Sequence, residues 1–171
     1  MGFWIFLGLV VVVVAAAAAL YNNIVTLENR FENAWGQIDV QLKRRADLIP
    51  NLVETVKGYA SHEKDVFDAV SQARSAMMGA KGPDDGATAA NMMDQALGRL
   101  FAISEAYPEL KANENFKGLQ EQLSEVEAKI AYARQFYNDA VLQYNNAIET
   151  VPGVFLAGPM GKKEHVFLEV P

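Results

Sequence analysis

Cysteine is absent from the sequence, and histidine occurs only at His62 and His165. The absence of cysteine excludes disulfides, thiol catalysis and thiolate metal sites. Neither histidine completes a metal motif, because no glutamate lies three residues before it, as a bundle di-iron site requires, and Val66 stands where a zincin needs its second histidine. The sequence also lacks a P-loop, a glycine-rich dinucleotide turn and a nucleophile elbow. We therefore expect no enzymatic activity, no cofactor, no bound metal and no small-molecule substrate.

Charge is scarce at the start of the chain, where the first charged side chain is Glu28. Over the whole sequence, 15 lysines and arginines stand against 21 acidic residues, which gives a net charge of −6. An acidic protein lacks the positive field that attracts phosphate backbones. Nucleic acid is therefore not expected as a partner.

The chain begins with an unbroken apolar run of 18 residues, Phe3 to Leu20. As a helix with a rise of ~1.5 Å per residue it is ~27 Å long, close to the ~30 Å hydrocarbon layer of a bilayer. Trp4 and Tyr21 stand at the two ends, where amphipathic rings favour the headgroup level. We therefore predict a membrane anchor over residues 1–22, with Phe3, Trp4, Leu20 and Tyr21 as its defining residues. The alternatives are a cleaved signal peptide, which would open with positive charge, and a buried core helix.

The basic residues near the anchor all follow it, beginning with Arg30 and the cluster Lys43, Arg44 and Arg45. Lysine and arginine beside a span favour the cytoplasmic side, so the bulk of the chain is expected in the cytoplasm. Lys43, Arg44 and Arg45 point in three directions on a helix, so at most two serve one ligand. They are candidate contacts for a phosphate or an acidic partner; the alternative is pairing with carboxylates such as Asp47 or Glu54.

Apolar residues recur every three or four positions from Phe116 to Val151, and shorter stretches within residues 24–60 and 89–107 repeat the pattern. Such spacing is typical of helices that pack at shallow angles in coiled coils and bundles. It predicts helices over residues 21–58, 62–80, 86–107 and 111–151, with a kink at Pro50 and a loop over residues 80–86. The fold class expected is all-α: a single transmembrane helix followed by an up-down four-helix bundle, residues 23–151, with long first and last helices. If residues 58–64 continue as helix, the alternative is one long antiparallel hairpin, 21–80 against 86–151.

The last residues, 152–171, form an apolar, glycine-rich tail without helical spacing. Val154, Phe155 and Phe167 are its candidate contacts, either with the lipid interface or with a neighbouring subunit. An arm that covers the bundle's own end is an equal alternative. Five asparagines within or beside the last predicted helix are unusual, because asparagine is a mediocre helix former; buried, some would fix register. They are Asn113, Asn115, Asn138, Asn145 and Asn146.

Several blocks of sequence carry a resemblance to a known family. They are YNNIVTLENRFENAWGQIDVQLKRRADLIPNLVETVKGYASHEK after the apolar start, then AISEAYPELKANENFKGLQEQL, IAYARQFYNDAV and YNNAIETVP. Over about residues 21–157 the chain resembles the LemA family of bacterial membrane proteins. The resemblance implies one N-terminal span carrying a helical bundle, in the bacterial plasma membrane, without established catalytic activity or cofactor. The tail departs from the family, with Gly158, Pro159 and MGKKEHVFLEVP where relatives tend to have a Gly-Phe, a Lys-Pro and an aromatic acidic stretch.

These observations favour a non-enzymatic, membrane-anchored scaffold or interaction module. Its expected partners are the lipid bilayer, further copies of itself in a homo-oligomer, and other membrane proteins. A two-helix stalk beside the membrane would leave its apolar seam half covered, and self-association would bury that seam. Membrane remodelling by ordered copies is the alternative function.

Overall fold

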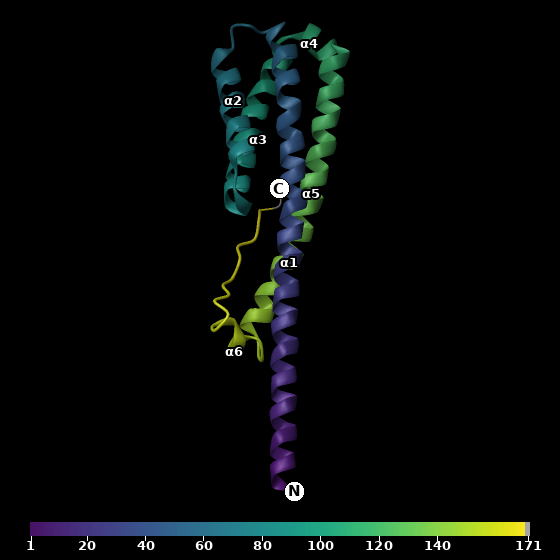
Figure 1. Ribbon diagram of the computed structural model, residues 1–171. Helices are drawn as coiled ribbons and strands as arrows, with labels where there is room; N and C mark the ends of the chain where they lie inside the picture. Colours follow the sequence, from purple (N-terminus) through teal and green to yellow (C-terminus); the bar gives the residue numbers. More distant parts are fainter. Residues whose placement is uncertain (170–171) are drawn as a thin grey trace. The chain divides into compact units, whose positions relative to one another are not determined.

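The computed structural model describes residues 1–169, and this part of the chain is helical without any strand (Figure 1). The all-α prediction is confirmed. The helices are α1 (Gly2–Lys57), α2 (Lys64–Gly79), α3 (Gly82–Ala106), α4 (Pro108–Ala112), α5 (Glu114–Glu149) and α6 (Val154–Ala157).

The chain divides into two compact units, which we describe separately. Unit 1 comprises Met1–Ala34 and Gln135–Glu169, and unit 2 comprises Trp35–Arg134. The two longest helices, α1 and α5, each contribute residues to both units. The predicted four-helix bundle over residues 23–151 extends over both units and stays a prediction.

Helix α1 runs for 56 residues without interruption, from the apolar start through Pro50 to Lys57. Proline lacks an N–H group, so Pro50 leaves the carbonyl of Ala46 without its helical donor. The Nε of Arg74, on α2, donates to that carbonyl at 3.0 Å. Arg74 of the neighbouring helix therefore supplies the hydrogen bond that the Ala46 carbonyl lacks because of Pro50.

The helix ends exclude one of the two arrangements expected from the sequence. Helix α1 stops at Lys57 and α2 starts at Lys64, so the chain is not helical through residues 58–63 and the single long hairpin is wrong. The loop predicted over residues 80–86 is present only at Ala80 and Lys81, because α3 begins at Gly82, so the predicted bounds are wrong. Pro83 suits the first turn, where no N–H is needed, and Asp84 and Asp85 favour the positive end of the helix.

A short helix, α4, stands at the corner that the sequence marks with Pro108. Asn113 follows it and accepts a hydrogen bond from the N–H of Phe116 at 3.0 Å, which caps the start of α5. The last long helix consequently begins at Glu114 rather than at residue 111.

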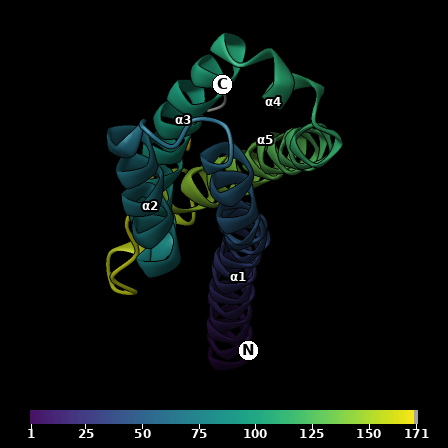
Figure 2. The same ribbon diagram turned by 90° about the horizontal axis from the view of Figure 1, so that it is seen from above.

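Within unit 2, α2 and α3 pack side by side (Figure 2). Phe101 of α3 meets Phe116 of α5 with ring centroids 6.2 Å apart. Trp35 of α1 lies so close to Gly86 of α3 that a Cβ there would fall 2.2 Å from the indole ring. The core of unit 2 includes fully buried side chains from α1, α2, α3 and α4: Leu52, Val56, Val70, Met77, Met93, Leu100 and Leu110.

Unit 1 pairs the first part of α1 with the last part of α5. Phe31 of α1 packs edge to face against Tyr137 and Tyr144 of α5, with centroids 6.4 and 5.0 Å apart. All three rings are buried, as is Ile24, which lies about two helical turns before Phe31 on the same face. These residues belong to the apolar stripes that the spacing identified, so that part of the prediction is confirmed.

Candidate functional site: the membrane span and the C-terminal arm

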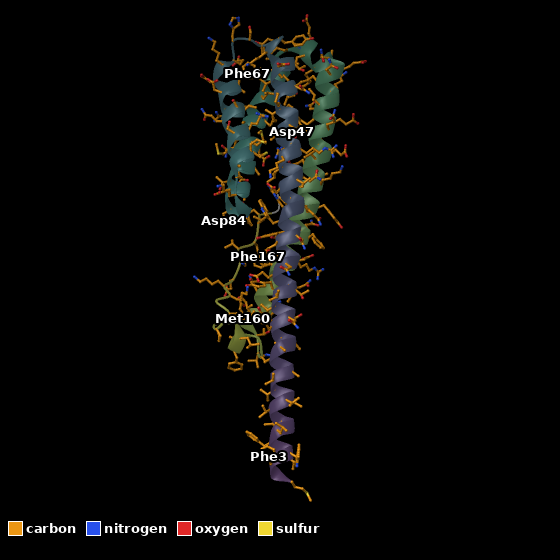
Figure 3. The ribbon with its side chains drawn as sticks, in the orientation of Figure 1. Phe3, Asp47, Phe67, Asp84, Met160 and Phe167 are labelled. Carbon is orange, nitrogen blue, oxygen red and sulfur yellow. The ribbon has the colours of Figure 1, made fainter. Side chains whose placement is uncertain are left out.

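The apolar run lies on the part of α1 that the other described residues leave mostly uncovered. The most apolar 18-residue stretch of this helix has none of its residues buried, which is unlike the core helix of a soluble protein. Phe3 is exposed near the start of the helix (Figure 3). Trp4 and Tyr21 are exposed as well, and Leu20 is half-buried. A helix that is apolar on every side and has its backbone hydrogen bonds closed internally matches a hydrocarbon surrounding.

The basic cluster does not form one binding surface. Lys43 is exposed and pairs with Asp39 at 2.6 Å, one turn away on the same helix. Arg44 is exposed as well, whereas Arg45 is only 5% exposed. The expected partners Asp47 and Glu54 do not appear in the ion pairs found for these residues.

Arg45 forms an ionic bridge inside unit 2. It pairs with Asp94 of α3 at 2.5 Å and with Glu127 of α5 at 2.9 Å. The Arg45 side chain is buried, whereas the side chains of Asp94 and Glu127 are 43% and 35% exposed, so solvent reaches the carboxylate side of the bridge. Arg45 therefore joins three helices, and its charge is engaged within the protein.

A groove of about 870 Å³ opens beside this bridge. Leu97, Phe101 and Leu123 give it apolar walls, and the Arg45 bridge lies along it. The described residues contain no group of three or more side chains able to hold a metal ion. Lys117, Glu121 and Ser124 line the groove as well, so it combines apolar walls with polar and charged side chains.

The C-terminal arm, residues 162–169, docks on α5 through two asparagine side chains. The amide of Asn145 donates to the carbonyl of His165 at 2.9 Å and accepts from its N–H at 3.0 Å. Asn138 does the same with Leu168, at 2.7 and 2.8 Å. A side-chain amide carries the same donor and acceptor as a peptide group, so each asparagine pairs with the arm as a neighbouring strand would.

The spacing of these two clamps is a geometric match. Asn138 and Asn145 are seven residues apart on a helix, a rise of ~10.5 Å that returns to the same face. His165 and Leu168 are three residues apart, and extended backbone covers ~10 Å in three residues. The distance between the two asparagines along α5 is therefore close to the length of arm between His165 and Leu168.

Contacts with α1 complete the docking of the arm. Lys162 forms an ion pair with Glu28, and this partner raises the pKa of Lys162 above its ordinary value. The ring of His165 packs against Phe31, with centroids 4.4 Å apart, and against Tyr144, at 5.5 Å. Burial raises the pKa of the Tyr144 hydroxyl. The arm thus covers the seam between α1 and α5, and the expectation of a half-covered seam in this unit is wrong.

The sequence signalled the clamps only indirectly. Asparagine inside a long helix was conspicuous, but its partner could not be read from helical spacing, because the arm has no periodicity of its own. The other tail candidates lie differently: Val154, Phe155 and Phe167 are exposed. Their role as partner contacts stays a prediction.

An exposed apolar span that continues into a helical body defines a membrane-anchored, all-helical protein. The LemA family model matches residues 34–171, and the chain belongs to this family. The resemblance stated from the sequence is thereby confirmed.

Curated relatives give the same picture. The chain is 29% identical over 178 residues to the magnetosome protein MamQ 2 of Paramagnetospirillum magneticum and to the magnetosome protein MamQ of Magnetospirillum gryphiswaldense, covering 88% of this chain and 65% of theirs. It is 24% identical over 130 residues to the protein LemA of Metamycoplasma hominis, covering 75% of this chain and 59% of that one. The chain therefore spans less than two thirds of the length of these relatives.

Proposed function

We propose that this protein is a non-enzymatic scaffold that self-assembles in the bacterial plasma membrane. The bare apolar span, joined without a break to a helical body, is the observation that carries the proposal. In this function the body is an up-down four-helix bundle with long first and last helices. Its partners are the lipid bilayer, further copies of the chain and other membrane proteins.

The chemistry of the described residues supports a physical rather than a catalytic role. The most buried charge near the groove, Arg45, is neutralised by Asp94 and Glu127. In unit 1, the side-chain amides of Asn138 and Asn145 form hydrogen bonds that hold the arm. Each of these groups therefore helps to hold the structure together.

The span supports self-association because its second half is rich in small side chains. Ala15 to Ala19 form a run of five alanines, and they precede Leu20. Small residues let transmembrane helices approach closely, where van der Waals packing holds them together. Anchoring in a membrane also raises the effective concentration of the copies. The lysines and arginines that follow the span support a cytoplasmic body.

Single-cysteine variants test this function cleanly, since the chain has no cysteine of its own. Ala15→Cys, Ala16→Cys, Ala17→Cys and Ala18→Cys together sample one turn of the span. Oxidation in native membranes should give disulfide-linked dimers at one or two of these positions and little product at the others, because a helix presents one face to its partner.

Equal, negligible cross-linking at all four positions, together with a strictly monomeric protein after detergent extraction, would refute self-assembly. Liposomes reconstituted with the protein separate scaffolding from membrane remodelling. A scaffold leaves the vesicles round, whereas a remodelling protein deforms them.

A further inference from the structure

The chain forms a compact knob, residues 151–161, between the end of α5 and the arm. Gly153 closes the reversal after α5: a Cβ at this position would lie 1.8 Å from the carbonyl oxygen of Ala147, so only glycine permits the approach. Helix α6 follows, and the knob ends in a Schellman motif at Gly161, which has a φ of 65°. In this motif the N–H of Lys162 bonds the carbonyl of Ala157 and that of Gly161 bonds the carbonyl of Gly158, both at 3.0 Å. The knob is therefore a fixed structure rather than a loose tail.

The outer surface of the knob is apolar and free of charge. Val151 is 74% exposed and Phe155 is 72% exposed, and Val154 is exposed between them. No charged residue occurs from Val151 to Gly161, and the next two residues are lysines. Apolar side chains on an uncharged segment, followed directly by basic residues, suit the boundary between acyl chains and anionic headgroups.

The knob also lies at the right level of unit 1. The Lys162 ion pair ties the end of the knob to Glu28 of α1, which is eight residues, or ~12 Å of helix, beyond the last residue of the apolar run. Helix α6 lies nearer the N-terminal end of α1 than the extended arm that follows it (Figure 1). Met160, in the last turn of the knob, lies between Phe167 and Phe3 along the direction of α1 (Figure 3). The exposed face of α6 is therefore at the end of the span where hydrocarbon gives way to water.

We propose that this knob is a second membrane contact, in which Val151, Val154 and Phe155 insert into the interfacial layer of the bilayer that α1 spans. The inference rests on the membrane anchor of the proposed function but not on self-assembly. The knob is held to α5 and, through the arm, to α1. Its insertion would therefore fix how deeply the span lies in the bilayer and which side of unit 1 faces the membrane surface.

Depth-dependent fluorescence quenching tests this proposal on the full chain. In a background with Trp4→Phe and Trp35→Phe, a single reporter is introduced as Phe155→Trp or, as the matched control, Phe167→Trp. Both phenylalanines are exposed, so neither substitution opens the core, but Phe167 lies farther from the span. The proteins are reconstituted into phosphatidylcholine–phosphatidylglycerol vesicles whose acyl chains carry bromine near the headgroups.

The expected result is about twofold quenching and a blue shift for the Phe155→Trp reporter, because interfacial helices bury their apolar face ~5–10 Å into this layer. The Phe167→Trp reporter should keep its emission. Equal emission of the two reporters with and without bromine would overturn the proposal. A blue shift at position 155 without quenching would overturn it as well, by showing that protein covers the knob.

A variant that keeps Trp4 alone separates this inference from the anchor. Trp4 lies at the far end of the span, so its quenching reports insertion of α1. Quenching at Trp4 without quenching at position 155 refutes the knob contact alone. No quenching at Trp4 refutes the anchor and the knob contact together, while the cysteine cross-links judge self-assembly independently.

Discussion

The hydrogen bond from Arg74 to Ala46 carries a specific energetic prediction. Ala46 is fully buried, and Pro50 cannot supply the N–H that its carbonyl would receive in an uninterrupted helix. Replacing Arg74→Ala leaves this carbonyl without a donor. The loss is therefore larger than that of a surface arginine.

The expected magnitude follows from the type of bond. A hydrogen bond to a charged group contributes ~1.5–3 kcal/mol, and a buried polar group left unsatisfied costs ~1–3 kcal/mol. Because Arg74 is half-buried and some water can reach the site, we expect Arg74→Ala to lower the free energy of unfolding by about 2 kcal/mol. In a unit of roughly 100 residues this corresponds to a melting temperature lower by about 10 °C.

A double-mutant cycle with Pro50→Ala checks the mechanism. Alanine at this position restores the N–H that can bond the Ala46 carbonyl, so Arg74→Ala should cost about 1 kcal/mol less in this background. Thermal unfolding of the full chain in mild detergent, followed by circular dichroism at a helical wavelength, measures all four proteins. Arg44→Ala, which removes an exposed arginine, controls for the loss of charge. An equal cost of Arg74→Ala in both backgrounds would refute the reasoning.

Three further predictions concern the arm and the helix contacts. Asn145→Ala removes both hydrogen bonds to the arm at one clamp, so hydrogen exchange of residues 162–169 should accelerate at least tenfold, for a loss of ~2 kcal/mol; unchanged exchange would contradict the clamp. Gly86→Ala should lower the free energy of unfolding and with it the melting temperature, because the new Cβ meets an indole ring at 2.2 Å. Gly98→Ala on the same helix has open space around it and should raise the free energy of unfolding by ~0.5–1 kcal/mol through helix propensity; thermal unfolding measures both. A hydrogen bond to Glu164 raises the pKa of Glu149 above its ordinary value of 4.5. Protonated Glu149 therefore stabilises the folded state below pH 4.5, and this stabilisation is lost as the pH rises through the higher folded pKa. The melting temperature should fall over this pH range in the wild type and not in Glu164→Gln.

Helical spacing predicted the long elements well, because their cause is local. The apolar run and the stripe through Phe31, Tyr137 and Tyr144 follow from residue types at fixed intervals. The break near Gly58 also has a local signal. These features required no knowledge of what each helix packs against.

The errors arose where a local signal has two meanings. Gly82, Pro83 and two aspartates are typical of loops, yet the same residues favour the first turn of a helix, and the structure uses them to start α3. Pro108 marked a corner, but the short helix after it is too brief for periodicity to reveal.

The candidate site depends on contacts that spacing cannot encode. Asn138 and Asn145 bond an irregular arm, and Arg45 pairs with Asp94 and Glu127 from two other helices. Each of these partners is distant in sequence and brought close only by the fold. Residue type alone marks these asparagines as unusual, and their hydrogen bonds to the arm explain why they occur within a helix.

The unbroken course of α1 has a consequence for how the molecule faces its neighbours in the bilayer. A continuous helix does not rotate freely about its axis between turns, so the direction of each side chain in the apolar run is fixed relative to the seam around Phe31. Each residue added between Leu20 and Ile24 would rotate the apolar run against this seam by about 100°. A one-residue insertion would thus redirect the lateral face of the molecule, while four residues, one turn with a little excess, would nearly restore it. The number of residues between Leu20 and Ile24 therefore sets the rotational position of the apolar turns relative to the seam around Phe31.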